Sequence, residues 1–477
     1  MSARLAAAAL LVLLGPVAAA AGVRPRYGGE LRVLLPAAPS ELDPARATTP
    51  ADLAAVRALH ATLLDVDDAG ALHPALLEAV PEPEEGGRAF RLRLAPGLRF
   101  HDGQPIAAAD IAASLARLAG PDSAHAWLAA PIDGAAAVRA GRARQLGGVQ
   151  VLSDRELRVV LAHPFPAFPQ ALAALPSAVV RGSAASGAGA FRRVGTSAAG
   201  LRLAAFEAFH GGRPFADLLL FSGADARSAA RALQGGAAEV ALRPEAVGAR
   251  PAIETTPLGI VVAVVSRRLG AAAEPTRAAL AALDRADLTR FIRAPATPLG
   301  ALLPPPLLPR VGSRPASARS SGTPAARLRL LLPDGPDAPR AAAERIQVKL
   351  YDGGVHVVLE SAPRAAFAAR VAAGDFDAAL VPVWLVSRAP ALALAQVAAA
   401  VGGPERGAQA LEQAVASEPQ ALPALAAALE AELLAVPLYA AGLRVSSRDG
   451  VQGVSLRADG TVDLGDAWLL PAQGRSP

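Results

Sequence analysis

The most informative segment of the chain is Gly97-Leu98-Arg99-Phe100-His101-Asp102-Gly103-Gln104-Pro105-Ile106. Before it, residues 90–94 alternate apolar and charged side chains, which is typical of a half-buried strand, and Pro96-Gly97 predicts a turn. After it, Ile111, Leu115 and Leu118 share one face at helical spacing and predict a helix over 107–118. The segment therefore joins a strand to a helix, and mixed α/β structure is expected around it.

Further strands are predicted on both sides, at 30–35, 157–161, 201–206, 215–221 and 260–265. The last is continuous and rich in β-branched residues, so burial on both faces is expected. Residues 294–324 are rich in Pro, Ser and Arg and are predicted to form a loop or linker. Beyond them a sheet flanked by helices is predicted, with strands at 327–332, 355–359 and 376–384 and helices at 338–350 and 363–373.

The composition limits the classes of protein to consider. A length of 477 residues suggests two or three domains, and 52% hydrophobic residues suffice for a large core. Lys349 is the only lysine among 47 basic residues, the net charge is +5, and the arginines are interleaved with acids. A nucleic-acid-binding protein concentrates its positive charge, so no nucleic-acid partner is expected. The lack of cysteine excludes disulfides, thiolate metal sites, a cysteine nucleophile and a lipidated N-terminal cysteine.

Residues 1–22 are predicted to be an export signal. Arg4 is followed by an apolar run at 5–14, a Gly15-Pro16 break and small residues at 18–22. The run is too short to span a bilayer, and no later uncharged apolar stretch is long enough. An apolar N-terminal helix is the alternative interpretation. The mature protein is expected to be soluble and periplasmic, without a lipid anchor.

No catalytic constellation is evident in the sequence. No two of the seven histidines are three or four residues apart, so no helical metal pair exists, although a site assembled in space stays open. No nucleophile elbow or phosphate-binding lysine loop is present, and the glycine-rich segment at 187–191 has Arg192 where a dinucleotide loop requires glycine. No cofactor, no metal and no enzymatic activity are therefore expected. An exported, multi-lobed α/β protein of this kind commonly binds its ligand in a cleft between domains.

The segment at 97–106, with 109–111 and 114–115, resembles the signature of the peptide/nickel (oligopeptide-type, family 5) solute-binding proteins of ABC importers. The resemblance continues in order over roughly 26–470. The matching segments include Ser40-Glu41-Leu42-Asp43-Pro44, Gly70-Ala71-Leu72-His73-Pro74, Gly187-Ala188-Gly189-Ala190-Phe191, His210-Gly211-Gly212-Arg213-Pro214 and Gly374-Asp375-Phe376-Asp377.

This resemblance implies a two-lobed periplasmic-binding-protein (Venus-flytrap) fold with an extra inserted α/β domain. Lobe I would comprise 23–46, 186–258 and 437–477, the extra domain 47–185, and lobe II 259–436. The signature would be a folding element, with Phe100 buried and a turn at Asp102-Gly103. The lobes would close on a ligand by hinge motion, and the protein, a monomer, would deliver it to a membrane ABC permease.

The expected ligand site departs from the family pattern. Peptide-binding members have an acidic residue shortly after the tryptophan that ends the "GDYD" strand, because a buried ammonium must be paired. Here Trp384 is followed by Ser387 and Arg388, and no acid occurs between Asp377 and Glu405. We therefore expect no peptide-type recognition of a free amino group, and an arginine facing the cleft would favour a carboxylate or phosphate. Arg388 pointing to solvent is the alternative.

The candidate ligand-binding residues are Trp384, Ser387, Arg388, Gly187 and Gly189. For Trp384, stacking on a ligand and packing in a core are both open. The ligand is expected to be peptide-like or another small molecule. Two other functions stay open besides an importer's binding protein: a ligand sensor or scaffold on the same fold, and, least favoured, an exported hydrolase.

Overall fold

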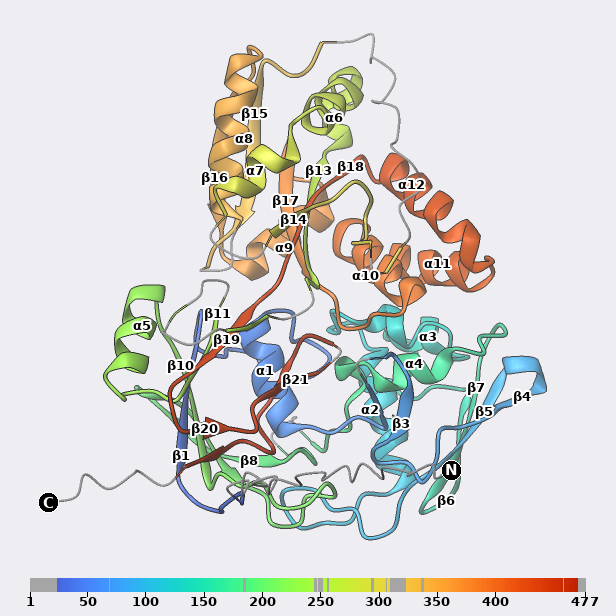
Figure 1. Ribbon diagram of the computed structural model, residues 1–477. Helices are drawn as coiled ribbons and strands as arrows, with labels where there is room; N and C mark the ends of the chain where they lie inside the picture. The colour runs from blue at the N-terminus through green and yellow to red at the C-terminus, as the bar shows by residue number, and fades with distance from the viewer. Residues whose placement is uncertain are drawn as a thin grey trace, which may run out of the picture.

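The computed structural model has two stacked halves, each built around its own large sheet, with a smaller sheet beside the lower one (Figure 1). It describes residues 24–67, 69–182, 186–243, 247, 252–254, 257–292, 296–305, 307–308, 323–335, 339–457 and 459–470. The predicted export signal at 1–22 lies outside the described residues. No helix in the described ranges has both the length and the apolar character needed to cross a membrane.

The lower half contains a seven-stranded sheet of order β12-β19-β11-β1-β10-β9-β8. β1 is parallel to β10 and β11, and the other pairings are antiparallel. Leu31, Val33 and Leu35 of β1 are fully buried and alternate with Arg32, which explains the strand. Helix α1 packs on one face, and α5 covers Leu34 on the other. The bounds are β1 Glu30–Leu35, β8 Phe191–Ser197, β9 Gly200–Ala205, β10 Leu218–Gly223, β11 Val240–Arg243, β12 Ile253–Glu254, β19 Arg444–Ser447, α1 Pro50–Leu59 and α5 Ala226–Gln234.

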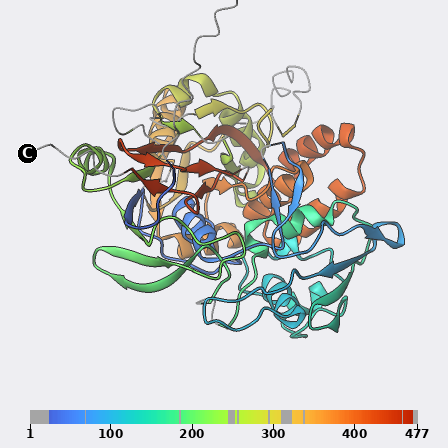
Figure 2. The same cartoon turned by 60° about the horizontal axis from the view of Figure 1, so that its bottom comes forward.

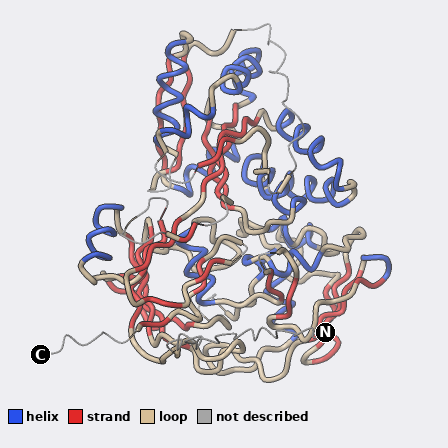
Figure 3. Tube along the Cα trace, in the orientation of Figure 1, coloured by secondary structure: helices blue, strands red, loops and turns tan. Residues whose placement is uncertain are grey.

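The upper half contains a six-stranded sheet of order β14-β18-β13-β17-β15-β16. β15 is parallel to β16 and β17, and β13 is buried along its whole length between two antiparallel neighbours. Helices α10, α11 and α12 gather beside this sheet (Figure 3). The bounds are β13 Gly259–Val265, β14 Ala296–Pro298, β15 Arg327–Pro333, β16 His356–Ala362, β17 Ala378–Trp384, β18 Ala435–Ala441, α6 Ala273–Ala281, α7 Arg285–Arg290, α8 Arg340–Asp352, α9 Arg364–Ala373, α10 Pro390–Gly402, α11 Pro404–Val415 and α12 Leu422–Glu432.

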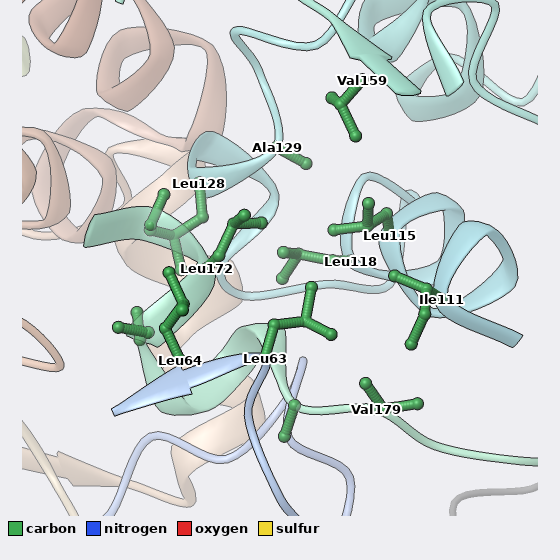
Figure 4. Packing of buried hydrophobic residues seen from close by; sticks show 14 of the residues in the cluster. Leu63, Leu64, Ile111, Leu115, Leu118, Leu128, Ala129, Val159, Leu172 and Val179 are labelled. Atoms are coloured by element: carbon green, nitrogen blue, oxygen red, sulfur yellow. The ribbon is translucent and has the colours of Figure 1, made fainter. Parts of the chain in front are cut away.

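A four-stranded antiparallel sheet of order β4-β5-β7-β6 lies to one side of the seven-stranded sheet (Figure 2). Its core gathers leucines and valines from β7, α2, α4 and the loops between them (Figure 4). The bounds are β2 Leu64–Val66, β3 Leu72–Pro74, β4 Pro83–Glu84, β5 Ala89–Arg93, β6 Val149–Ser153, β7 Glu156–Val160, α2 Ala108–Leu118, α3 Ala135–Arg139 and α4 Phe168–Ala173. A short 3-10 helix, η2, spans Ala126–Leu128.

The signature segment folds as the resemblance implies. The Phe100 ring is fully buried, and Gly103 donates its N–H to the Phe100 carbonyl at 2.9 Å with a φ of +82°, a conformation that favours glycine. The Asp110 carboxylate accepts the Ala107 N–H at 2.9 Å and caps the start of α2. The segment thus forms the turn that connects the strand to the helix, and its Phe100 side chain packs in the core.

The expected loop at 294–324 is only partly irregular. Its start forms β14 on the edge of the six-stranded sheet, and Leu299, Leu302 and Leu303 are buried in the core below it. Much of the remainder lies outside the described residues. The loop prediction, which rested on the Pro, Ser and Arg content, therefore missed a strand and a buried leucine cluster.

Two short connections join the halves. β12 ends at Glu254 and β13 begins at Gly259, while β18 ends at Ala441 and β19 begins at Arg444. β19 enters the lower sheet between β11 and β12, and two small hairpins follow it. These hairpins use β20 Val451–Gln452 with β23 Trp468–Leu469, and β21 Ser455–Leu456 with β22 Val462–Asp463.

Candidate functional site

A cavity of about 440 Å³ opens where the two halves and the small-sheet region meet. Its walls come from α1, the β2–β3 hairpin and α4 below, from the loop between β17 and α10 above, and from the β21–β22 hairpin near the chain end. Ten lining residues are apolar: Val66, Ala69, Gly70, Ala167, Ala173, Ala174, Leu307, Val386, Ala389 and Pro390. The polar ones are Arg57, Gln170, Ser387, Arg388, Arg457 and Asp459.

The β17–α10 loop is held in place by the buried side chain of Gln396. Its amide nitrogen donates to the Trp384 carbonyl at 2.6 Å, and its amide oxygen accepts the Val386 N–H at 2.9 Å. Ser387 Oγ accepts the Ala389 N–H at 3.1 Å, which shapes the turn into α10. These bonds place Ser387 and the half-buried Arg388 in the cavity wall, so two of the predicted site residues lie together there.

The opposite wall carries a network of arginines and aspartates. Arg57 of α1 binds Asp459 and donates through Nε to Thr461 Oγ1 at 3.2 Å. Arg457 binds Asp65 of β2 at 2.5 Å and Asp463 of β22 at 2.6 Å. The network fastens the C-terminal hairpin to α1 and β2 behind the cavity.

The pKa values of two groups in this network, Asp459 and Arg457, are shifted so as to favour their charged forms. Burial raises the pKa of the Asp459 carboxyl, but Arg57 and the Thr461 hydrogen bonds outweigh it and hold that pKa below its usual range. Burial lowers the pKa of the Arg457 guanidinium, and the Asp65 and Asp463 carboxylates more than offset this, leaving it raised. The Arg457 guanidinium therefore faces the cavity as a cation.

Trp384, a candidate stacking residue, lies outside the cavity lining. Its half-buried ring packs against the cores of both the seven-stranded sheet and the small-sheet region. A Cβ at Gly259, its partner across the strand pair, would lie 2.8 Å from the ring, so glycine is required there. The packing interpretation of Trp384 is the one these contacts favour.

Gly187 and Gly189 pack against the end of α1. A Cβ on Gly187 would lie 2.1 Å from the Leu59 carbonyl oxygen, and one on Gly189 would lie 2.4 Å from the Leu59 carbonyl carbon. The His101 N–H donates to the Gly187 carbonyl at 2.9 Å. Neither glycine lines the cavity, and their role in ligand binding stays a prediction.

Four polar residues of the lining carry no mark in the sequence that singles them out: Arg57, Gln170, Arg457 and Asp459. Arg57 lies in an ordinary helix, and Arg457 and Asp459 lie in a hairpin about 400 residues away that no motif marks. Their meeting depends on the tertiary fold. No cluster of three or more acidic or histidine side chains able to hold a metal ion occurs in the described part of the chain.

Comparison with known proteins agrees with this architecture. Residues 71–270 match the model of the bacterial extracellular solute-binding proteins, family 5 middle region. Over 140 residues the chain is 35% identical to the probable deoxycholate-binding periplasmic protein YgiS of Escherichia coli K12. That match covers 28% of this chain and 26% of YgiS, so it spans about a quarter of that relative's length.

Two solved structures share the fold over almost the whole chain. Haemophilus influenzae OppA in complex with the peptide RPPGFSPFR superposes with a TM-score of 0.78 at 14% identity, covering 94% of this chain and 100% of that one. AgaA of A. tumefaciens R10 in complex with agropinic acid superposes with a TM-score of 0.74 at 17% identity, covering 93% and 99%.

The fold is therefore that of the OppA-type two-lobed periplasmic binding proteins, as the resemblance implies. The matched family model and the two similar solved structures are those of binding proteins. The family 5 model matches the central residues 71–270 and the two-lobed fold surrounds them, so the chain is similar to the family 5 bacterial extracellular solute-binding proteins in this region and shares the OppA-type fold over almost its whole length.

Proposed function

We propose that the protein is exported to the periplasm, captures a small ligand in the cavity between its lobes and delivers it to an ABC permease. The observation that carries the proposal is the cavity itself, because its walls come from all three sheet regions. A ligand held there touches both halves, so binding favours the closed arrangement. Two short connections between the halves are the expected hinge.

We also propose the domain division stated above: lobe I at 23–46, 186–258 and 437–477, the extra domain at 47–185, and lobe II at 259–436. Each sheet takes its strands from one of these sets of segments, which supports the division, with one exception: β18 belongs to the six-stranded sheet, although its residues 437–441 fall in the proposed lobe I. Helix α1 contributes to the cores of both the seven-stranded sheet and the small-sheet region, so the boundary at 46/47 divides a shared core.

Native mass spectrometry of the purified protein tests ligand capture. We expect a small molecule to copurify with the protein and to be absent from Gln170→Trp, which fills the cavity from α4. Gln413→Trp, on the exposed side of α11, is the matched control and should retain the ligand. A copurified molecule that both variants retain equally would place binding elsewhere.

Uptake measurements test delivery. Deletion of the gene in its host should abolish uptake of the copurified molecule, and the wild-type gene should restore it. Normal uptake in the deletion strain would contradict the transport role and leave binding as the function.

A further inference from the structure

The cavity lining is dominated by apolar groups and cations. Three arginines line it, Arg57 and Arg457 from below and Arg388 from above, against a single acid, Asp459. Asp65 and Asp463, which bind Arg457, are not among the lining residues. The surface offered to a ligand is thus apolar with an excess of guanidinium groups, although the wider network is balanced.

Asp459 already uses three of the roughly four acceptor positions of its carboxylate within the protein. Its Oδ1 accepts the Thr461 N–H at 3.0 Å and the Thr461 hydroxyl at 2.5 Å, while Oδ2 accepts from Arg57. A buried ammonium needs a paired anion, and an approaching one would instead meet the guanidinium groups. The arrangement therefore disfavours a free amine.

Arg57 retains donor capacity. Its Nε and Nη2 are used by Thr461 and Asp459, whereas Nη1 lies 3.7 Å from Asp65, beyond hydrogen-bond distance. Within the described residues Nη1 makes no shorter polar contact, and the side chain is only 11% exposed. A carboxylate oxygen in the cavity would complete its hydrogen bonding.

We propose, resting on the proposed binding function, that the ligand is an amphipathic organic anion: an apolar body with one carboxylate. The carboxylate accepts from Arg57 of the lower half and from Arg388 of the upper half. The apolar body packs on the surface formed by Val66, Ala173, Ala174, Leu307 and Val386. One negative charge suits this lining better than a phosphate dianion, because most of the wall offers no donor.

Calorimetry with three probes of the same chain length tests the head group: decanoate, decanol and decylammonium. We expect decanoate to bind at least about tenfold more tightly than decanol, since hydrogen bonds to a charged group are worth about 1.5–3 kcal/mol. Decylammonium should not bind measurably. The dipeptide Ala-Ala, with its free amino group, should also fail to bind.

Variants then test the two arginines. Arg388→Gln and Arg57→Gln should each weaken decanoate binding about tenfold to a hundredfold and leave decanol binding nearly unchanged. Arg340→Gln, which removes an exposed arginine of α8, is the matched control and should bind as the wild type does. Thermal denaturation checks that each variant is folded; if Arg57→Gln is not, Arg388→Gln alone decides.

The possible results separate the two proposals. Three results would each overturn the ligand class and leave the binding function intact. The first is tighter binding of decylammonium or Ala-Ala than of decanoate. The others are a decanoate affinity in folded Arg388→Gln equal to that of the wild type, and a copurified molecule without an acidic group. Absence of any copurified molecule, together with no response to any of the four probes, overturns the binding function itself.

Discussion

Two histidines are fully enclosed in the lower part of the molecule and are held neutral there. Burial lowers the pKa of His60 to about 3 and that of His125 to about 4. His125 Nε2 lies 2.8 Å from the Ala47 carbonyl oxygen, and its Nδ1 has no partner among the described residues. Protonation in the folded state would place an uncompensated charge in the core.

The free energy of unfolding should therefore fall as the solution is acidified. Unfolded histidine takes up a proton near pH 6.5, so this stability is complete above that pH and is lost as the pH falls toward 4. At pH 5 the loss from His125 is about 2 kcal/mol. Urea denaturation of the wild type and of His125→Gln at pH 7 and pH 5 measures it.

The free energy of unfolding should differ between pH 7 and pH 5 by about 2 kcal/mol less in His125→Gln than in the wild type. His356→Gln, which removes an exposed imidazole, is the control. Equal pH dependence in His125→Gln and the wild type would show that this imidazole is protonated in the folded state.

The backbone at Gly187 lies close to the backbone at Leu59, the last residue of α1. Gly187→Ala should destabilise the protein by about 1–3 kcal/mol or more, because its Cβ would lie 2.1 Å from the Leu59 carbonyl oxygen and backbone must move. Gly195→Ala, where no atom lies within 4 Å, should change stability little. Chemical denaturation compares the pair, and equal effects would contradict the clash.

Some of the site could be read from the sequence at this scale. Trp384 marks the end of a strand, so the next residues were expected near the cleft, and Ser387 and Arg388 do line the cavity. Arg57 and Asp459 had no comparable marker, since each looks like an ordinary polar residue until the fold brings them together. Local pattern carries no information about such long-range partners.

At the scale of elements, the β17–α10 loop depends on one side chain. Gln396→Met should cost about 1–3 kcal/mol, because it leaves the Val386 N–H and the Trp384 carbonyl without their partner. We also expect faster hydrogen exchange at the Val386 amide and weaker ligand binding, since Ser387 and Arg388 lose their support.

Gln347→Met on α8 is the matched control, because it removes a single bond to the Val357 carbonyl. Hydrogen exchange followed by mass spectrometry should show no change at Val386 in that variant. Unchanged Val386 exchange in Gln396→Met would mean that the loop is held by other contacts.

Elements with strong periodicity were predicted well and marginal ones were not. β1, α2, β13 and the β15–α8–β16–α9–β17 series lie close to their expected positions because burial dictates their patterns. The edge strand β14 was missed, because its sequence, Ala-Thr-Pro, has no alternation and lies in a proline-rich segment. Such a strand is defined by its neighbour β18 rather than by its own residues.

At the scale of the whole molecule, the upper half packs directly on the small-sheet region. Leu411 of α11 is almost fully buried in the same cluster as Trp127 and Leu128 of η2. Arg139 and Glu405 form an ion pair at 3.6 Å across this contact, but a pair this exposed stabilises little. The apolar contact is therefore the main attraction between these parts.

Leu411→Glu should separate them without unfolding either half. A buried unpaired carboxylate is costly, and opening at the hinge exposes it to water. Small-angle X-ray scattering should show a larger radius of gyration, while circular dichroism stays as in the wild type. Gln413→Glu, on the exposed side of the same helix, should leave the radius unchanged. A folded Leu411→Glu with an unchanged radius would contradict this role.

The position of β19 has a consequence for the order of folding. Residues 444–447 fill the gap between β11 and β12, so the lower sheet has a missing member until almost the entire chain is available. Pairing over such long sequence separations is slow, because the entropy cost of closing the loop must be met before the stabilising contacts form. The six-stranded sheet of the upper half is complete by Ala441. During synthesis, both large sheets therefore close only when the last part of the chain becomes available, and the N-terminal strand waits for the C-terminal segment before its sheet is closed.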